Sequence, residues 1–281
     1  MKQRFPGDAA TLGPGETVLL LDRKGRRYLI TLEPDGEFHY HGGAIAHDDI
    51  LGQPEGIRVR SAKGNWVRVF RPTAADWTVK APRGAQVVYP KDQALIIGLA
   101  DIGPGMTVIE AGAGSGALTC ALLQAVGERG QVISFEVRDD HADIAERNVV
   151  RRFGELPPNW TLRRGDVTAG LADVTCHRVV LDLLEPWEVC KPSASALFPG
   201  GILCVYTPTV PQVMRVHEAL IEDGRWGTTE TVEALLRPWH VTGLAVRPVH
   251  RMVAHTAFLT IARRLPDPSP ELDPRSLPGS E

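Results

Sequence analysis

The chain has 281 residues, of which 43% are hydrophobic and 23% are charged, and its formal net charge is −3. The length excludes a minimal module and predicts one or two domains. The composition is ordinary for a globular protein, and the charge gives no overall basic signal, although a local basic face would suffice to bind RNA. The start of the chain lacks the apolar core of a signal peptide, and no apolar run approaches the roughly 18 residues of a membrane span. We therefore expect a cytoplasmic protein without a membrane segment.

A β-rich segment comes first in the chain. Glu16–Asp22 and Arg26–Leu32 predict one hairpin, and Ile57–Ser61 and Trp66–Phe70 predict another. Apolar and basic residues alternate along the second hairpin, which indicates one buried face and one wet, basic face. We expect a small β-barrel or β-sandwich domain over residues 1–75, with a supporting role in docking RNA.

Neither the histidines of this segment nor the cysteines of the chain form a convincing metal-binding pattern. His39, His41 and His47 lack the carboxylate or cysteine that would complete a ligand set, so we interpret them as polar residues of the β-domain. The cysteines show no C-x-x-C spacing and are expected to be reduced thiols in a cytosolic protein. They are Cys120, Cys176, Cys190 and Cys204.

Residues 73–105 are expected to form a linker that leads into a larger domain. Asp92 is placed to cap a helix that runs through Ala94–Ile97. Tyr89 precedes this helix in a loop rich in proline and glycine. Its ring is either a packing element or a stacking surface for a substrate base, as aromatic side chains are in RNA-binding proteins.

A glycine-rich turn follows the first strand of the larger domain. The apolar run Met106–Ile109 leads to Glu110 and then to alternate glycines from Gly112 to Gly116, and a helical pattern begins at once. Such a turn brings backbone N–H groups close to a ligand, although a lone G-x-G-x-G also occurs in purely structural turns. Dinucleotide sites use G-x-G-x-x-G spacing, and an acid at Glu110 would repel a pyrophosphate. The pattern favours a ligand with a cationic group and no phosphate, such as S-adenosylmethionine.

Three further predicted strands also lead to an acid. Glu136, Asp166 and Asp182 each follow a short apolar run. Glu136 at a strand tip can accept both ribose hydroxyls of a nucleotide-like ligand, and Asp166 is placed to meet an adenine edge. Asp182 has an alternative role as the N-cap of a following helix. His141, near the start of the helix after Glu136, is either a surface residue or a cofactor contact.

Strands and helices alternate over residues 106–265, which predicts an α/β domain with a parallel, doubly wound sheet. We expect a catalytic domain over residues 76–265 and a disordered, proline-rich tail over residues 266–281. Val241–Val246 and Thr256–Ala262 are expected to pair antiparallel at the edge of the sheet. Apolar strands at an exposed edge invite pairing with another chain, which favours an oligomer.

The order of these pieces resembles the class I S-adenosylmethionine-dependent methyltransferases, which have a Rossmann-like seven-stranded sheet. Within that superfamily, four motifs are similar to those of the tRNA (adenine-N1)-methyltransferase family, and they are closest to its actinobacterial members. These motifs are Glu110–Gly116, Asp182–Trp187, Tyr89–Asp92 and His255–Leu259. Ala254 stands where many members have glycine, and the tail is unrelated, but neither difference touches the proposed site.

The resemblance implies an enzyme that methylates N1 of adenine 58 in the T loop of tRNA and, in bacteria, forms a homotetramer. It implies that Asp182 lies at the methyl donor and faces the target base, which Tyr89 helps to place. It also implies that Glu136 holds the ribose of the cofactor, that Asp166 meets its adenine and that His141 lies beside it. The other predicted cofactor residues are Glu110, Gly112, Gly114, Ser115, Gly116, Ala117 and Leu118.

The implied chemistry is an in-line displacement, in which adenine N1 attacks the sulfonium methyl group and S-adenosylhomocysteine leaves. A carboxylate near N6 would accept a hydrogen bond and stabilise the positive charge that grows on the purine. Three other functions stay open: a methyltransferase for a protein or small molecule, a nicotinamide-dependent oxidoreductase, and a non-catalytic RNA-binding subunit. The glycine spacing opposes the oxidoreductase, and the intact cofactor motif opposes the non-catalytic subunit.

Overall fold

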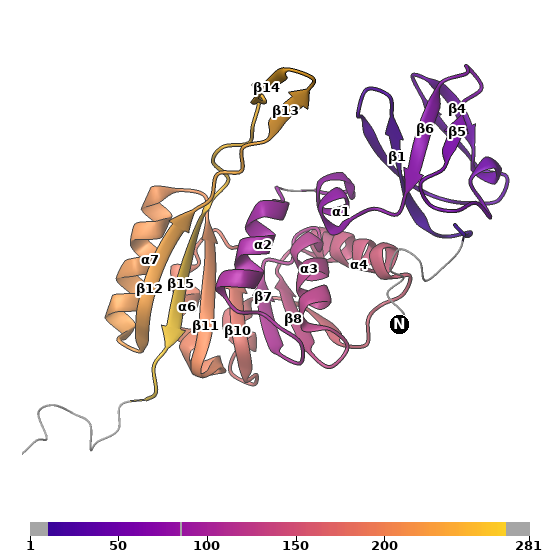
Figure 1. Cartoon of the computed structure of the whole chain (residues 1–281). Helices are drawn as coiled ribbons and strands as arrows, with labels where there is room; N and C mark the ends of the chain where they lie inside the picture. The colour runs from indigo at the N-terminus through magenta and orange to yellow at the C-terminus, as the bar shows by residue number, and fades with distance from the viewer. Residues whose placement is uncertain (1–10, 85, 268–281) are drawn as a thin grey trace, which may run out of the picture. The chain divides into compact units, whose positions relative to one another are not determined.

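The computed structural model describes residues 11–84 and 86–267, and its backbone contacts divide the chain into two compact units (Figure 1). The first unit consists of Met1–Pro90, Ala113–Ala121 and Asp139–Trp160. The second consists of Lys91–Gly112, Leu122–Arg138 and Thr161–Glu281. The domain boundaries after residues 75 and 265 stay predictions, and the predicted disordered tail lies outside the described residues from residue 268 onward.

The β-rich part of the first unit consists of two small antiparallel sheets around one apolar core. A four-stranded sheet has the order β2-β1-β6-β5, and β3 pairs with β4. Inward-facing residues of both sheets, such as Leu20, Ile45 and Val67, form a single buried cluster. In β5 the exposed Arg58 and Arg60 flank the buried Val59, so the predicted alternation of a basic and a buried face is confirmed. The elements are β1 (Thr17–Asp22), β2 (Arg27–Thr31), β3 (Glu37–Tyr40), β4 (Gly43–Ala46), the 3-10 helix η1 (His47–Asp49), β5 (Arg58–Arg60) and β6 (Trp66–Phe70).

The three histidines of this β-domain have separate partners. His47 is buried and accepts a hydrogen bond from a backbone N–H, whereas His39 and His41 lie beside Glu37 and Arg26. In the part of the chain that the structure describes, no group of three or more His, Cys, Asp or Glu side chains is placed to hold a metal ion. The four cysteines are all buried as free thiols.

The second unit is built on a seven-stranded sheet of the order β12-β15-β11-β10-β7-β8-β9 (Figure 1). β7 runs parallel to its neighbours β8 and β10, and β10 runs parallel to β11, whereas β15 runs antiparallel to β11 and β12. The expected α/β architecture is therefore confirmed. The strands are β7 (Thr107–Ala111), β8 (Gln131–Glu136), β9 (Trp160–Arg164), β10 (Cys176–Leu181), β11 (Leu197–Thr207), β12 (Trp226–Glu233) and β15 (Phe258–Arg264).

The strand order reverses between β7 and β10. From β7 the chain adds β8 and β9 on one side, and it then returns to place β10 and β11 on the other side. The loops that leave β7 and β10 therefore diverge. Open α/β sheets bind their ligands in the crevice at such a point, outside the carboxyl ends of the strands.

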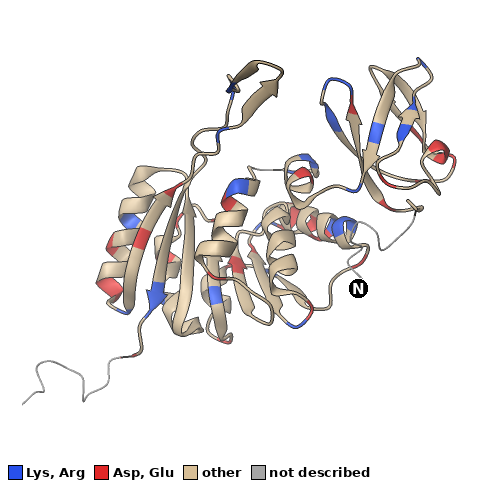
Figure 2. Ribbon diagram, viewed as in Figure 1, with Lys and Arg blue, Asp and Glu red and all other residues tan. Residues whose placement is uncertain are grey.

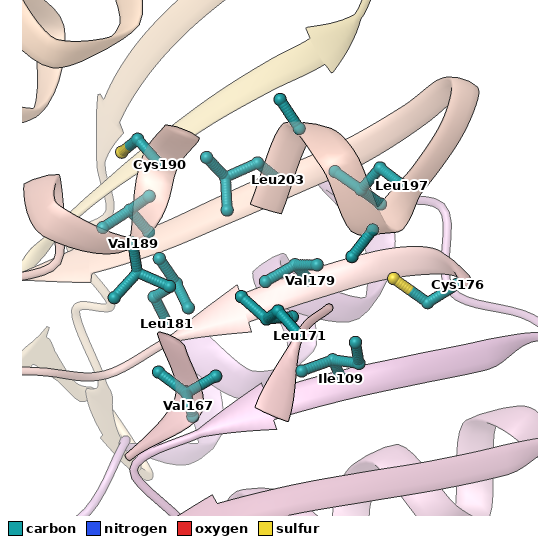
Figure 3. Packing of buried hydrophobic residues seen from close by; sticks show 14 of the residues in the cluster. Ile109, Val167, Leu171, Cys176, Val179, Leu181, Val189, Cys190, Leu197 and Leu203 are labelled. Atoms are coloured by element: carbon teal, nitrogen blue, oxygen red, sulfur yellow. The ribbon is translucent and has the colours of Figure 1, made fainter. Parts of the chain in front are cut away.

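Helices connect the strands, and apolar side chains pack α6 against one face of the sheet. Figure 3 shows Val189 and Cys190 of α6 in one buried cluster with Val179 and Leu181 of β10 and Leu203 of β11. Among the described residues, no helix has the length and apolar character that crossing a bilayer requires. The helices are α1 (Ala74–Lys80), α2 (Pro90–Leu99), α3 (Ala117–Val126), α4 (Asp139–Phe153), α5 (Val167–Gly170), α6 (Trp187–Ala196) and α7 (Val210–Asp223).

The prediction for the C-terminal strands is partly wrong. Val241–Val246 is not one strand, because the chain turns at Gly243 between β13 (Trp239–Thr242) and β14 (Ala245–Pro248). These two strands pair only with each other, and their hairpin extends away from the sheet (Figure 1). The partner of β15 at the sheet edge is instead β12, whose sequence Trp226–Glu233 is too polar to predict an apolar strand.

The segment predicted to be a linker contains a helix that the sequence interpretation missed. Thr73 and Asp76 form a capping box at the start of α1, in which each side chain accepts a hydrogen bond from the other residue's backbone N–H. The prediction that Asp92 caps the next helix is wrong. α2 begins at Pro90, so Asp92 lies inside its first turn, where its carboxylate has other partners.

Candidate active site

The turn after β7 needs glycine for two separate reasons. Gly112 and Gly116 have φ values of 87° and 75°, in the left-handed region that side chains disfavour. A Cβ on Gly112 would lie 2.1 Å from the backbone oxygen of Asp182, and a Cβ on Gly116 would lie 3.0 Å from the backbone oxygen of Ala145. Gly112 and Gly116 are thus required by backbone conformation and by close approach of other backbone, whereas the predicted approach of a ligand to this turn stays a prediction.

Backbone hydrogen bonds hold the ends of β7, β8 and β10 together. The Gly112 N–H donates to the Phe135 carbonyl at 3.0 Å, and the Asp182 N–H donates to the Ala111 carbonyl at 2.9 Å. These bonds fix the start of the glycine turn and the residue that follows β10. The two loops that diverge at the strand-order reversal are therefore rigid at their origin.

A cleft of about 360 Å³ opens at these strand ends within the second unit. Its volume is within the range of small-molecule sites. Glu136 and Asp166 line it, as predicted, together with Gly112. The rest of its lining comes mainly from the strand ends and from the loop between β10 and α6, and includes Ala111, Phe135, Leu183, Leu184 and Glu185.

Glu136 and Asp166, the two predicted acids among those that line the cleft, differ in their surroundings. Glu136 is buried, and its Oε1 accepts a hydrogen bond from the Arg138 backbone N–H at 3.0 Å. Asp166 is exposed and caps the short helix α5, because its carboxylate accepts hydrogen bonds from the hydroxyl and backbone N–H of Thr168. These bonds lower the pKa of Asp166 and keep it charged.

Asp182 is a partly buried acid directly after β10. Burial, and secondarily the negative charge of Glu136, raise the pKa of Asp182 to about 7. No side chain or backbone group among the described residues donates a hydrogen bond to its carboxylate. The N-cap of α6 is Pro186, so the alternative that Asp182 caps this helix is wrong. Asp182 is not among the residues that line the cleft, but its carboxylate is close enough to Glu136, which does line it, for the two negative charges to repel.

Glu110 lies inside the sheet, one residue before the end of β7. It is fully buried, and its carboxylate accepts a hydrogen bond of 2.5 Å from the Ser134 hydroxyl on β8. It is not among the residues that line the cleft. Its predicted contact with a cofactor therefore stays a prediction.

The remaining predicted cofactor residues belong to the first unit. Ala117 and Leu118 are buried in the first turn of α3, and Gly114 has a positive φ in the turn before it. His141 is buried in the first turn of α4, so the interpretation of a surface histidine is wrong. The roles of Ser115 and His141 toward a cofactor stay predictions.

Asn148 on α4 is a structural residue of this region that the sequence interpretation missed. Its side-chain amide donates to the Ser115 carbonyl at 2.9 Å and to the Pro82 carbonyl at 2.7 Å. It thereby ties the glycine turn to the segment that precedes Tyr89. A buried asparagine within an amphipathic helix is the available signal, because asparagine disfavours helix interiors unless its amide has another task.

Two motifs that are far apart in the sequence meet in the second unit. The Lys91 ammonium lies 2.6 Å from both the Asp92 carboxylate and the Thr256 hydroxyl, and that hydroxyl donates to Asp92 at 2.7 Å. The segments around Tyr89 and His255 are thus joined at the start of α2. Tyr89 is partly buried, and its predicted contact with a base stays a prediction.

His255, the neighbour of Thr256, links two further segments of the second unit. Its Nε2 lies 2.8 Å from the Pro208 carbonyl and its Nδ1 lies 2.7 Å from the Glu233 carboxylate. Because both partners are acceptors, both ring nitrogens carry a proton in this arrangement. The Pro208 carbonyl and the Glu233 side chain raise the pKa of His255 accordingly. The motif therefore anchors the start of β15 to the end of β11.

Comparisons with known proteins match most of the chain. The family model described as "tRNA methyltransferase complex GCD14 subunit" matches residues 65–246, and the model "TrmI-like N-terminal" matches residues 11–59. A tRNA (adenine(58)-N(1))-methyltransferase TrmI of Thermus thermophilus is 40% identical over 88% of this chain and 96% of its own length. A Methanocaldococcus jannaschii enzyme named for adenines 57 and 58 is 33% identical over 89% of this chain and 95% of its own length.

Solved structures agree with these matches in fold. The structure of a SAM-dependent O-methyltransferase from Thermotoga maritima has a TM-score of 0.87 and 32% identity, and covers 92% of this chain and 97% of that chain. The tRNA (m1A58) methyltransferase TrmI from Aquifex aeolicus has a TM-score of 0.79 and 28% identity, and covers 91% of this chain and 99% of that chain.

Proposed function

This chain belongs to the tRNA (adenine-N1)-methyltransferase family, and we propose that it transfers a methyl group from S-adenosylmethionine to N1 of adenine 58 in the T loop of tRNA. The observation that carries the proposal is the coupling of two acids at the carboxyl ends of the strands on either side of β7: Glu136, which ends β8 and lines the cleft, and Asp182, which follows β10 and whose pKa Glu136 helps to raise. The proposal places the enzyme in the cytoplasm with its tRNA substrate.

The residues of the cleft fit S-adenosylmethionine. Glu136 at the tip of β8 can accept the hydroxyl groups of a ribose, and the exposed, charged Asp166 can accept the amino group of an adenine. Gly112 allows the backbone of Asp182 to lie against the turn, which brings Asp182 to the strand ends where the cofactor would bind. The proposal also assigns Glu110, Gly114, Ser115, Gly116, Ala117, Leu118 and His141 to the cofactor, on the family resemblance alone.

When bound, S-adenosylmethionine would supply an electrophilic methyl group on its sulfonium. Adenine N1 would bond to that methyl carbon as the carbon–sulfur bond breaks, and S-adenosylhomocysteine would be the leaving group. Asp182 accepts a hydrogen bond from the exocyclic amine of adenine and stabilises the positive charge that develops on the ring. Tyr89 positions the base by stacking, which matters because adenine N1 needs orientation more than deprotonation. The base must first leave the folded T loop, at a cost of a few kcal/mol that contacts with the RNA offset.

We infer that the enzyme assembles as a homotetramer through the β13–β14 hairpin. Trp239, Val241 and Val246 are each more than half exposed, and Leu244 at the turn is fully exposed. A projecting hairpin with this much apolar surface is typical of a protein-binding segment. A second copy of this chain is the proposed occupant, in line with the homotetramers that the family resemblance implies.

Mass spectrometry of nucleosides tests the function directly. The purified enzyme is incubated with S-adenosylmethionine and an unmodified tRNA transcript, and a transcript with guanine at position 58 serves as the matched control. We expect 1-methyladenosine at position 58 of the first transcript and no methylation of the second. Methylation of an oxygen of the tRNA, the kind of transfer for which the Thermotoga protein is named, or no methylation of tRNA, would contradict the proposal.

A further inference from the structure

A second pocket lies in the N-terminal β-domain. It has a volume of about 380 Å³ and is lined by residues of three turns: Asp22–Lys24, Tyr40–Gly42 and Asn65–Trp66. All three turns belong to the first unit, whereas the residues that line the cleft at the strand ends belong to the second. The lining combines cationic side chains with aromatic rings.

Strand pairing explains why these three turns meet. β1 runs antiparallel to both β2 and β6, with Asp22 opposite Val67, so the β1–β2 turn and the β5–β6 turn lie at the same end of the sheet. The β3–β4 turn joins them there. Its Ser61 and Asn65 neighbours donate side-chain hydrogen bonds to the Gly42 carbonyl, at 2.6 and 2.9 Å. These two hydrogen bonds hold the β3–β4 turn against the β5–β6 turn at the pocket.

This end of the β-domain is strongly basic. The β1–β2 turn carries Arg23, Lys24 and Arg26, and the β5–β6 turn carries Lys63 (Figure 2). The single acid of the lining, Asp22, is buried and accepts hydrogen bonds from the backbone N–H groups of Lys24 and Arg26. Its charge is thus directed into the turn, while the cationic side chains reach solvent.

Acidic residues gather at the opposite end of the same domain. Asp35 lies in the β2–β3 turn, and its backbone N–H donates to the carboxylate of Asp48 in η1. Glu33, Glu37 and Asp49 are exposed in the same two segments. The domain has charges of opposite sign at its two ends, which orients it toward an anionic partner.

The two strands joined by the β5–β6 turn carry arginines on facing positions. Arg58 and Arg68 face each other directly across β5 and β6, an arrangement of like charges that destabilises a sheet. Within the described residues, neither side chain forms an ion pair. The Arg58 guanidinium lies over the Trp66 ring at 4.6 Å from its centroid, so a cation and an aromatic surface stand together beside the pocket.

We propose that this pocket, whose residues are distant in sequence from those of the methyl-transfer cleft, binds one nucleotide of the tRNA. The phosphate of that nucleotide contacts Arg23 and Lys24, and its base stacks against Trp66. The inference rests on the proposed function, because tRNA is the substrate it names. Single-stranded RNA is recognised by cations that contact phosphates and by aromatic rings that stack on bases, and this pocket offers both. An acidic peptide could bind the cationic side chains, but it would leave the aromatic rings of the pocket without a stacking partner, so the lining favours RNA over an acidic peptide.

Titration of tRNA binding with the full-length enzyme tests the proposal. The variant Arg23→Gln/Lys24→Gln is compared with Arg129→Gln/Arg263→Gln, which removes two exposed charges of the second unit, one just before β8 and one near the end of β15. We expect the pocket variant to bind tRNA about 10-fold more weakly and to lower the slope of log K against log salt by about one to two, since two phosphate contacts are lost. The control variant should bind tRNA as the wild type does.

Kinetics and cross-linking separate this proposal from the proposed function. The pocket variant should raise KM for tRNA while kcat at saturating tRNA and affinity for S-adenosylmethionine stay unchanged. Ultraviolet cross-linking of tRNA to the wild type should label the peptide that contains Trp66, and Trp66→Leu should bind tRNA more weakly while melting as a folded protein.

Equal tRNA affinity in the pocket variant and the wild type, or cross-links confined to other peptides, would overturn the pocket assignment even if adenine 58 is methylated. Binding of free adenosine monophosphate in this pocket without any effect on tRNA affinity would overturn it as well. Conversely, loss of tRNA affinity in an enzyme that leaves adenine 58 unmethylated would support the pocket and contradict the proposed function.

Discussion

The α-carbon of Gly112 faces the backbone carbonyl of Asp182 so closely that a Cβ would lie 2.1 Å from its oxygen. Gly112→Ala must therefore displace the backbone that carries Asp182. We expect loss of S-adenosylmethionine binding by more than tenfold in calorimetry, together with a lower melting temperature. The matched control is Gly105→Ala, because Gly105 has a similar φ of 85° but no atom within 4 Å of its Cβ position. That variant should lose only the roughly 1–2 kcal/mol of left-handed strain and bind the cofactor normally.

Replacing Asp182 tests the role of its charge. Asp182→Ala should fold and bind tRNA, but its single-turnover rate with both substrates saturating should fall by roughly 10²–10³-fold, as when one preorganised electrostatic partner is removed. Asn should rescue little, since it keeps an acceptor but not the charge. Asp173→Ala, an exposed aspartate, is the control. A near-normal rate in Asp182→Ala would move the catalytic role to another acid of the strand ends.

The pH dependence of the reaction follows from the raised pKa of Asp182. The charged form is the active one, so kcat/KM for S-adenosylmethionine should rise about tenfold per pH unit on the acid side and level off above the pKa of about 7. Glu136→Gln removes the neighbouring charge and should move this limb to lower pH. Glu185→Gln, in the same cleft, should leave its position unchanged. A profile without an acid limb between pH 5 and 8 would contradict the assignment.

The same pKa shift makes Asp182 a cost to stability. Its folded pKa is raised, so the folded state binds more protons than the unfolded state between the ordinary value of 3.8 and about 7, and stability falls as pH rises through that window. We expect Asp182→Asn to be more stable than the wild type at pH 8, by about 1–2 kcal/mol after discounting for partial exposure, with the difference vanishing near pH 4. Thermal melts at the two pH values measure it. Equal melting temperatures at pH 8 would show that the carboxyl group is well solvated.

The hairpin provides a test of assembly. Val241→Lys/Leu244→Lys places charges on its apolar surface and should convert the proposed tetramer to smaller species in light scattering. Ile221→Lys, an equally exposed apolar position on α7, is the control and should leave the mass unchanged. Wild-type protein that is monomeric at working concentration would contradict the proposed assembly.

The parts of the fold that the sequence predicts best are those where a strong local pattern coincides with burial. β7, β8 and β10 are short apolar runs at the centre of the sheet, and their ends place Glu136 and Asp182 as expected. β12 has no such pattern, because an edge strand with one solvent-exposed face tolerates polar residues such as the threonines and glutamates of Trp226–Glu233. The hairpin turn at Gly243 lies within the largely apolar stretch Val241–Val246, which has the composition of a single strand.

The acids at the strand ends could be predicted from the sequence, whereas the hydrogen bonds that join distant segments around the candidate site could not. Asp182 after an apolar run is visible in the sequence, whereas its raised pKa depends on how burial and Glu136 combine in three dimensions. The Lys91–Asp92–Thr256 cluster joins residues more than 160 positions apart, so no local pattern reports it. Asn148 offers only a weak signal, because its partners Pro82 and Ser115 are also far from it in the sequence.

The position of β15 has a consequence for how the protein is made. This strand lies between β11 and β12 and directly follows the segment that contains His255 and Thr256, so the sheet has a gap until this part of the chain leaves the ribosome. Until then β11 exposes an unpaired, apolar edge of the kind that promotes aggregation of nascent chains. A protein truncated before residue 258 would keep the glycine turn, Glu136, Asp166 and Asp182, but its sheet would lack the strand between β11 and β12, which would make it a target for chaperones and proteases.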